Sequence, residues 1–260
     1  MGGHAGALSS DPAAIYANPA TAGGIGTMQI ETFVTDTAVR LPDTWGIALR
    51  NPPQDQKGGI GILFLRHLLL VDSNQIRSTQ LDLAITDKRI GFPVGAGLKI
   101  VGEQPGLGKR WTYGFSLDLG FLISLGGLEF GGAAKDVMGM RILSEPRRFE
   151  AGAAYQINDF SFTAGMGTQE MSARTALYQA KRTWGYGLEW HALDNALIRG
   201  GKFMEQGRQG ESMGLGYTTT ENGVIIAYSA RRFTDDPKNI THWLSYTFSA
   251  SVSSSGNSPF

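Results

Sequence analysis

The sequence predicts an all-β fold, in the form of an antiparallel transmembrane β-barrel of about 14 strands. Three observations lead to this prediction. Large apolar residues alternate with small or polar ones over many segments, the second face of these segments is rich in glycine, serine and threonine, and no amphipathic helical pattern of about ten residues or more competes. The chain has 260 residues, of which 42% are hydrophobic and 18% charged, and this composition excludes a disordered polymer.

The individual strands follow from the alternation, which is clearest in residues 109–120. There every odd position from Trp111 to Leu119 is large and apolar, whereas the even positions are small or polar. Four more segments alternate as clearly, at 149–157, 184–190, 213–217 and 244–248. Weaker patterns predict nine further strands, at 28–37, 44–50, 59–69, 76–86, 92–101, 128–135, 159–166, 196–203 and 224–231. Turn signals such as Asn222-Gly223 separate the strands, and residues 168–181 fit either a helix or a long loop.

The alternation alone does not say whether the apolar face points inward to a core or outward to lipid. A soluble sandwich carries many lysines and glutamates on its second face, where this chain has glycine, serine and threonine. Strands of about 9–11 residues have the length of a tilted bilayer crossing. Aromatic residues near the strand ends suit the interfacial girdles of a membrane barrel, and these are Trp111, Trp184, Trp190 and Tyr246. We favour the membrane barrel and keep a soluble all-β binding or scaffold protein as an alternative.

Composition excludes several functional classes. The 23 basic and 23 acidic residues leave no positive field for nucleic acid, so we expect no nucleic-acid partner. The chain has no cysteine, and its four histidines lie far apart without ligand spacing, so we expect no metal and no other cofactor. The longest apolar stretch, 59–71, is interrupted by Arg66 and His67 and is shorter than the ~20 residues of a spanning helix.

The chain shows no convincing catalytic motif, and we expect that it is not an enzyme. Residues 210–214 fit the G-x-S-x-G pattern, but that pattern is a nucleophile only at a turn from a strand to a helix. Here Ser212 begins an alternating segment, which favours an ordinary strand position. Asp118 and Glu150 are conceivable as an acid and base pair, but nothing in the sequence sets their separation.

The N-terminal residues 1–20, which include Asp11 and the triplet Asn18-Pro19-Ala20, resemble the start of mature PorV/PorQ-type proteins, relatives of the FadL outer-membrane transporters. Residues 128–136 with 146–155 resemble the central hairpin of that superfamily, although Asp136 stands where asparagine is more usual. Residues 241–248 resemble its closing strand.

The resemblance implies a domain organisation and a location. Residues 1–25 form an N-terminal plug, 26–249 the barrel and 250–260 a C-terminal tail. In the plug, Asp11, Asn18, Pro19 and Ala20 are the candidate positioning residues. The implied location is the bacterial outer membrane. The chain starts without a basic and apolar export signal, and because the resemblance begins at Met1 we expect that signal upstream of Met1, outside the given sequence.

Charged residues at the polar positions of the predicted strands are candidates for the barrel lumen. Mixed signs predict mutual pairing inside the barrel rather than a strongly charged conduit. These residues are Arg110, Asp118, Arg148, Glu150, Glu189 and His191.

The resemblance implies two functional classes, each with membrane lipid around the barrel. One is a PorV/PorQ-like partner of a protein-secretion system, which would bind secretion components. The other is a FadL-like passive transporter of hydrophobic small molecules such as long-chain fatty acids. FadL-type proteins are usually longer because of elaborate loops, so the short loops expected here favour the secretion role.

Overall fold

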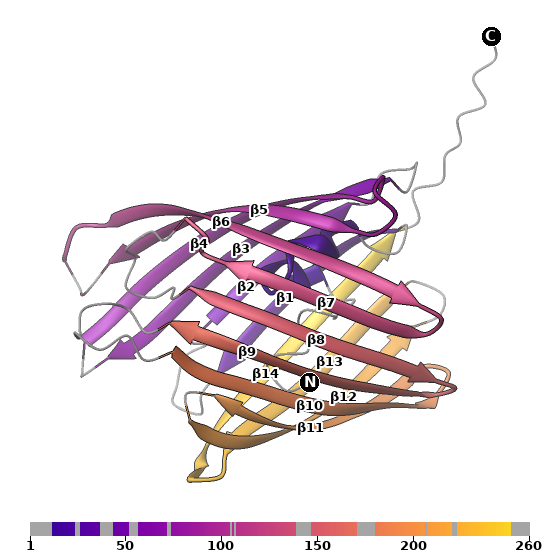
Figure 1. Ribbon diagram of the computed structural model, residues 1–260. Coiled ribbons are helices and arrows are strands. Elements are labelled where there is room, and N and C mark those ends of the chain that lie inside the picture. The colour runs from indigo at the N-terminus through magenta and orange to yellow at the C-terminus, as the bar shows by residue number, and fades with distance from the viewer. Residues whose placement is uncertain are drawn as a thin grey trace.

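The computed structural model describes residues 12–23, 27–36, 44–51, 57–71, 74–104, 106, 108–138, 147–170, 180–205, 207–219 and 223–250. Fourteen antiparallel strands form one closed barrel, in which each strand pairs with its neighbours in sequence and β14 pairs with β1 (Figure 1). The strands are β1 Met28–Asp36, β2 Thr44–Asn51, β3 Gly58–Val71, β4 Asn74–Asp87, β5 Val94–Gln104, β6 Thr112–Leu125, β7 Leu128–Lys135, β8 Arg148–Ile157, β9 Phe160–Glu170, β10 Ala180–Leu193, β11 Ala196–Glu205, β12 Arg208–Thr219, β13 Val224–Phe233 and β14 Asp236–Ala250.

The predicted fold class is confirmed, and each of the fourteen predicted strands overlaps an observed one. Residues 168–181 differ from the helical alternative. Their first residues belong to β9, which ends at Glu170, and their last belong to β10, which begins at Ala180. Residues 171–179 lie outside the described part of the chain.

The pleat places the large apolar side chains on the outside of the barrel. In β6, Phe115 is 54% exposed and Leu119 is 42% exposed, whereas Ser116 and Asp118 between them face inward and are buried. A water-soluble sandwich would bury the apolar side chains between two sheets instead. The soluble alternative is therefore wrong, because one closed sheet leaves these rings and aliphatic chains on its outer surface.

Aromatic pairs lie near both ends of the outer apolar band. Phe160 and Trp190 stack with ring centroids 6.1 Å apart, close to the turn between β8 and β9. At the other end Trp111 and Tyr113 stack at 6.3 Å, although Trp111 itself precedes β6. Such belts are typical of the interfaces of membrane barrels. No helix in the described part of the chain is long and apolar enough to cross a membrane.

The two ends of the barrel differ. We call the end at which β1 begins and β14 ends the terminal end, and the opposite end the loop end. The connections at the loop end include residues 136–147 and 171–179, whereas the terminal end includes the two-residue turns at 126–127 and 158–159. Residues 251–260, most of the expected C-terminal tail, lie outside the described chain, and Ala250 still belongs to β14.

Two short 3₁₀ helices lie within the barrel and against its wall: η2, Pro12–Tyr16, and η3, Pro19–Gly23 (Figure 1). We call residues 12–23 the inner segment. It contacts the inner faces of β1 to β6, and every residue of η3 is buried.

Candidate functional site

The inner segment is held by hydrogen bonds to side chains of several strands. Glu31 of β1 accepts a bond from the Ala13 amide at 2.9 Å. Thr86 of β4 donates to the Pro19 carbonyl at 2.9 Å, and Lys88, just after β4, donates to the Gly23 carbonyl at 3.1 Å. These bonds satisfy backbone groups that a 3₁₀ helix in a barrel interior would otherwise leave without partners.

Asn18 connects the two short helices to the wall. Its Nδ2 donates to the Phe121 carbonyl of β6 at 3.1 Å, and its Oδ1 accepts a bond from the Ala20 amide at 3.0 Å. Its own carbonyl accepts a bond from the Thr21 hydroxyl at 2.7 Å. Asn18, Pro19 and Ala20 are thus buried residues of the inner segment, whereas Asp11 lies outside the described residues.

Three glycines of the wall make room for the inner segment. A Cβ atom on Gly59 would lie 2.3 Å from the Ala22 carbonyl oxygen, and one on Gly95 would lie 2.3 Å from the Ala20 nitrogen. A Cβ on Gly120 would meet the side-chain oxygen of Asn18. Any larger residue at these positions would push the inner segment away from the wall, because real carbon atoms do not approach so closely.

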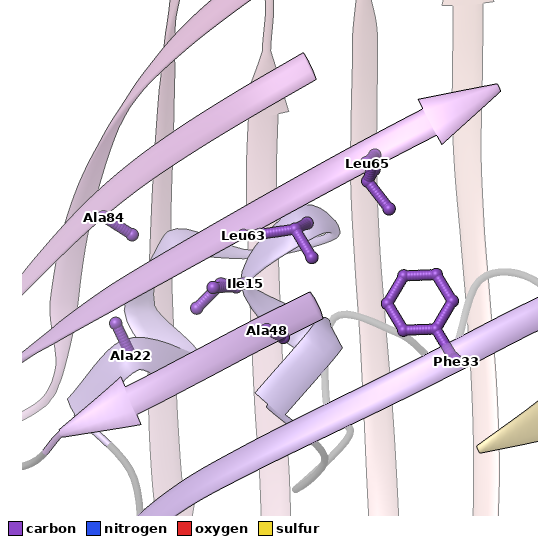
Figure 2. Close-up of a cluster of buried hydrophobic side chains, with 7 residues drawn as sticks. All are labelled: Ile15, Ala22, Phe33, Ala48, Leu63, Leu65 and Ala84. Atoms are coloured by element: carbon purple, nitrogen blue, oxygen red, sulfur yellow. The ribbon is translucent and has the colours of Figure 1, made fainter. Parts of the chain in front are cut away.

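One side of the lumen is apolar. The inner segment packs there against inward-facing residues of β1 to β4 (Figure 2). This apolar cluster consists of Ile15, Ala22, Phe33, Ala48, Leu63, Leu65 and Ala84. The ring of Trp243, which shares the inward parity of Ser245 and Thr247 in β14, stacks on Phe33 with centroids 4.8 Å apart. Because Trp243 remains 36% exposed, it extends the cluster as an aromatic surface that faces the lumen.

The adjoining wall, from β4 to β7, carries buried charges. Lys99 Nζ lies 3.3 Å from Asp118 and 3.6 Å from Asp136, and all three side chains are buried. Asp136 has a φ of 57°, in the left-handed region where aspartate and asparagine are favoured. Lys135 places its ammonium 3.6 Å from the ring centroid of Tyr16, which links this charged wall to the inner segment.

A third group of charges lies across the barrel on β10 and β11. Arg199 Nε donates to Glu189 at 2.5 Å, and His191 Nε2 lies 3.0 Å from the other oxygen of the same carboxylate. These residues face the lumen at strands β10 and β11, away from β1 to β7, the strands with which the inner segment makes its described contacts.

The predicted lumen residues fall into separate places. Asp118 belongs to the buried charges of β4 to β7, and Glu189 and His191 form the group with Arg199. Arg148 and Glu150 occupy inward-facing, half-buried positions of β8. Arg110 differs, because it precedes the start of β6 at Thr112 and is exposed in the connection from β5. The pattern around it extended the alternation beyond the true end of the strand.

Several lumen residues are missing from the sequence-based set, notably Lys99, Lys135 and Arg199. Each lies at the inward parity of a predicted strand, so the same criterion that selected Asp118 could have found them. Ser212 faces inward in the middle of β12, opposite Arg231 of β13. It does not lie at a turn from a strand to a helix, which excludes the nucleophile-elbow geometry.

No protein-family model matches the chain, and no curated protein sequence matches it. Solved structures resemble it along nearly the whole chain. The toluene transporter TbuX of Ralstonia pickettii has a TM-score of 0.65 at 16% identity, over 92% of this chain and 93% of that one. A Pseudomonas aeruginosa FadL homologue has a TM-score of 0.64 at 13% identity, over 94% of this chain and 95% of that one. The toluene transporter TodX of Pseudomonas putida has a TM-score of 0.63 at 11% identity, over 92% of this chain and 94% of that one.

At these identities the likeness concerns the fold, and it is the FadL-like fold expected from the resemblance. Two of the proteins compared are toluene transporters. The comparisons give no support to PorV/PorQ in particular, nor to a role in protein secretion. The chain shares its overall barrel fold with FadL-type transporters.

Proposed function

We propose that this chain is a passive transporter of hydrophobic small molecules in the bacterial outer membrane, as the FadL-like alternative predicted. The observation that carries the proposal is the exposed aromatic surface of Trp243, which stacks on the buried Phe33 inside the lumen. A polar, water-filled pore gains nothing from a tryptophan ring exposed to its interior, whereas an apolar solute gains contact area from it. The similarity in fold to two toluene transporters supports the same class of solute.

The inner segment would control the path of the solute. It occupies the lumen beside the apolar cluster and is held by hydrogen bonds and packing, which reform after displacement. The solute would move along the cluster with no energy source beyond its own gradient, because hydrophobic contact is non-directional and gives no preferred sense of movement.

The test is uptake of toluene and of a long-chain fatty acid into liposomes that contain the protein. Replacing Trp243→Ala should slow the uptake several-fold, because the solute loses the aromatic surface in the lumen. Trp190→Ala is the matched control, since Trp190 is 42% exposed on the outer face, where it stacks on Phe160. The native protein should exceed empty liposomes, and equal rates would overturn the proposal. Equal slowing in both variants would also contradict it.

The protein-secretion role stays a prediction from the resemblance alone. It requires stable binding of a secretion component or exported protein, whereas the transporter requires none. Cross-linking in the native outer membrane followed by mass spectrometry would reveal such a partner. A stable complex of this kind, together with no uptake of apolar solute by the protein in liposomes, would favour the secretion role.

A further inference from the structure

The two edges of the outer apolar band differ in charge. In the half of the barrel toward the loop end, basic side chains face outward on five strands, at Arg66, Arg77, Arg182, Lys202 and Arg232. In the half toward the terminal end, none of the described outward-facing strand residues is lysine or arginine. The cations therefore lie at one membrane edge only.

Two of these cations are close neighbours. Arg66 of β3 lies opposite Thr79 of β4, and Arg77 is two residues from Thr79 along the same strand. Diagonal neighbours on one face of an antiparallel pair have their Cα atoms roughly 7–8 Å apart. Both arginines face outward, because Leu65 beside Arg66 and Ser78 beside Arg77 are buried in the interior. We call Arg66 and Arg77 the arginine pair.

The arginine pair has no acidic neighbour at the strand positions directly opposite it. Trp45 and Thr79 flank Arg66, whereas Leu68 and Gln104 flank Arg77. Arg232 on the same outer face differs, since its guanidinium lies 2.5 Å from Glu211. Two adjacent guanidinium groups that face no carboxylate at these described strand positions repel each other, and an anion between them would remove this repulsion.

The position of the arginine pair matches the headgroup level of a bilayer. Toward the terminal end the outer face becomes apolar at once, with Phe64 on β3 and Leu81 on β4. Trp45 and Phe64 form an aromatic pair with centroids 5.4 Å apart. Arginine beside an aromatic belt lies where lipid phosphates lie, and guanidinium groups bind phosphate oxygens with charge-assisted, bidentate hydrogen bonds.

We infer that the arginine pair binds the phosphate headgroup of an anionic lipid in the leaflet around the loop end. The phosphate lies between the two guanidinium groups. The acyl chains run along the apolar band over Phe64 and Leu81. This lipid site is on the outside of the barrel and is independent of the proposed transport through the lumen.

The experiment measures lipid binding to the full chain in detergent by native mass spectrometry. Dioleoyl phosphatidic acid presents an accessible phosphomonoester, and dioleoyl phosphatidylcholine has the same acyl chains but a phosphate covered by choline. The native protein should bind phosphatidic acid more tightly than phosphatidylcholine. In the double variant Arg66→Gln/Arg77→Gln the Kd for phosphatidic acid should rise roughly tenfold to thirtyfold. This is the change expected when two basic residues near a lipid phosphate each lose their usual contribution to the binding free energy.

The matched control is Lys109→Gln/Arg110→Gln, which removes the same charge from exposed positions of the loop-end connection between β5 and β6. Its Kd should not change. The variant Arg66→Lys/Arg77→Lys keeps the charge without the bidentate geometry and should bind at an intermediate level, which also covers the case in which the glutamine variant folds poorly. An unchanged Kd in the glutamine variant, equal loss in the control, or displacement of the lipid by millimolar inorganic phosphate would overturn the inference.

Discussion

At the scale of single residues, the interior of this barrel depends on wall glycines, which have no side chain, as much as on buried charged side chains. Glycines at 59, 95 and 120 leave the space that the inner segment fills. Buried charges compensate one another beside it, with Lys99 between Asp118 and Asp136. Removing one of these charged side chains lowers the stability of the fold by more than the whole ion pair contributes to it, because the remaining charge stays buried without an opposite charge.

Gly95→Ala should displace the inner segment. The new methyl group would meet backbone atoms of Pro19 and Ala20, which cannot move aside as a side chain could. We expect a loss of about 1–3 kcal/mol in the free energy of unfolding and faster hydrogen exchange of the inner-segment amides. Gly200→Ala is the control, since nothing lies within 4 Å of its added methyl group. Unchanged exchange in Gly95→Ala would contradict the packing described above.

Lys99→Met should destabilise the barrel by about 3–5 kcal/mol, because Asp118 and Asp136 lose the ammonium between them. Urea-induced unfolding in lipid vesicles measures the loss. Adding Asp118→Asn should recover part of it, since the second change removes one uncompensated charge. Additive losses in the double variant would show that the two residues do not interact.

At the scale of elements, the strands could be predicted because alternation is a property of each segment on its own. The ends of the strands could not be predicted in this way, as Arg110 shows. The alternation of polar and apolar residues continues before Thr112, but the hydrogen-bonded pairing of β6 with β5 begins only at Thr112. The partner of each lumen charge was equally inaccessible from the sequence. Glu189 meets Arg199 because the β10–β11 register places them opposite each other, and this register depends on the turn between the strands.

The turn between β13 and β14 contains a pH-dependent contact. Arg208 Nε and a second guanidinium nitrogen each donate to Asp235 at 2.8 Å, and these hydrogen bonds hold the pKa of Asp235 below its ordinary value of 3.8. The contribution to stability is present above that ordinary value and is lost as the pH falls through the lowered pKa. NMR titration of the Asp235 carboxyl should show the pKa rising toward its ordinary value in Arg208→Gln. The same titration curve in both proteins would exclude this cause.

At the scale of the whole molecule, closure of the sheet decides which solvent each face meets. β14 pairs with β1 along nine residues, so the barrel has no free strand edge, and its apolar face has only the surroundings to contact. The same closure encloses the inner segment and brings Trp243 of the last strand onto Phe33 of the first.

Leu215→Arg tests the direction of the outer face. Leu215 is 60% exposed in the apolar band of β12, and a charge there should lower the stability of the barrel in a bilayer by about 2–4 kcal/mol. Gln209→Arg, on the same face of the same strand but at the loop end, should cost about 0–1 kcal/mol. Reversible unfolding in vesicles compares the two variants, and equal costs would mean that this face does not meet lipid.

The sequence by itself determined the number of strands, the face on which each residue lies and the membrane character of the barrel, because these follow from a two-residue period and from the chemistry of each face. Only the tertiary structure decided which residues meet. Lys99 and Asp136 come from β5 and the end of β7, and Arg66 and Arg77 from β3 and β4. Such contacts depend on the register of every strand around a closed sheet, and no segment carries that register alone.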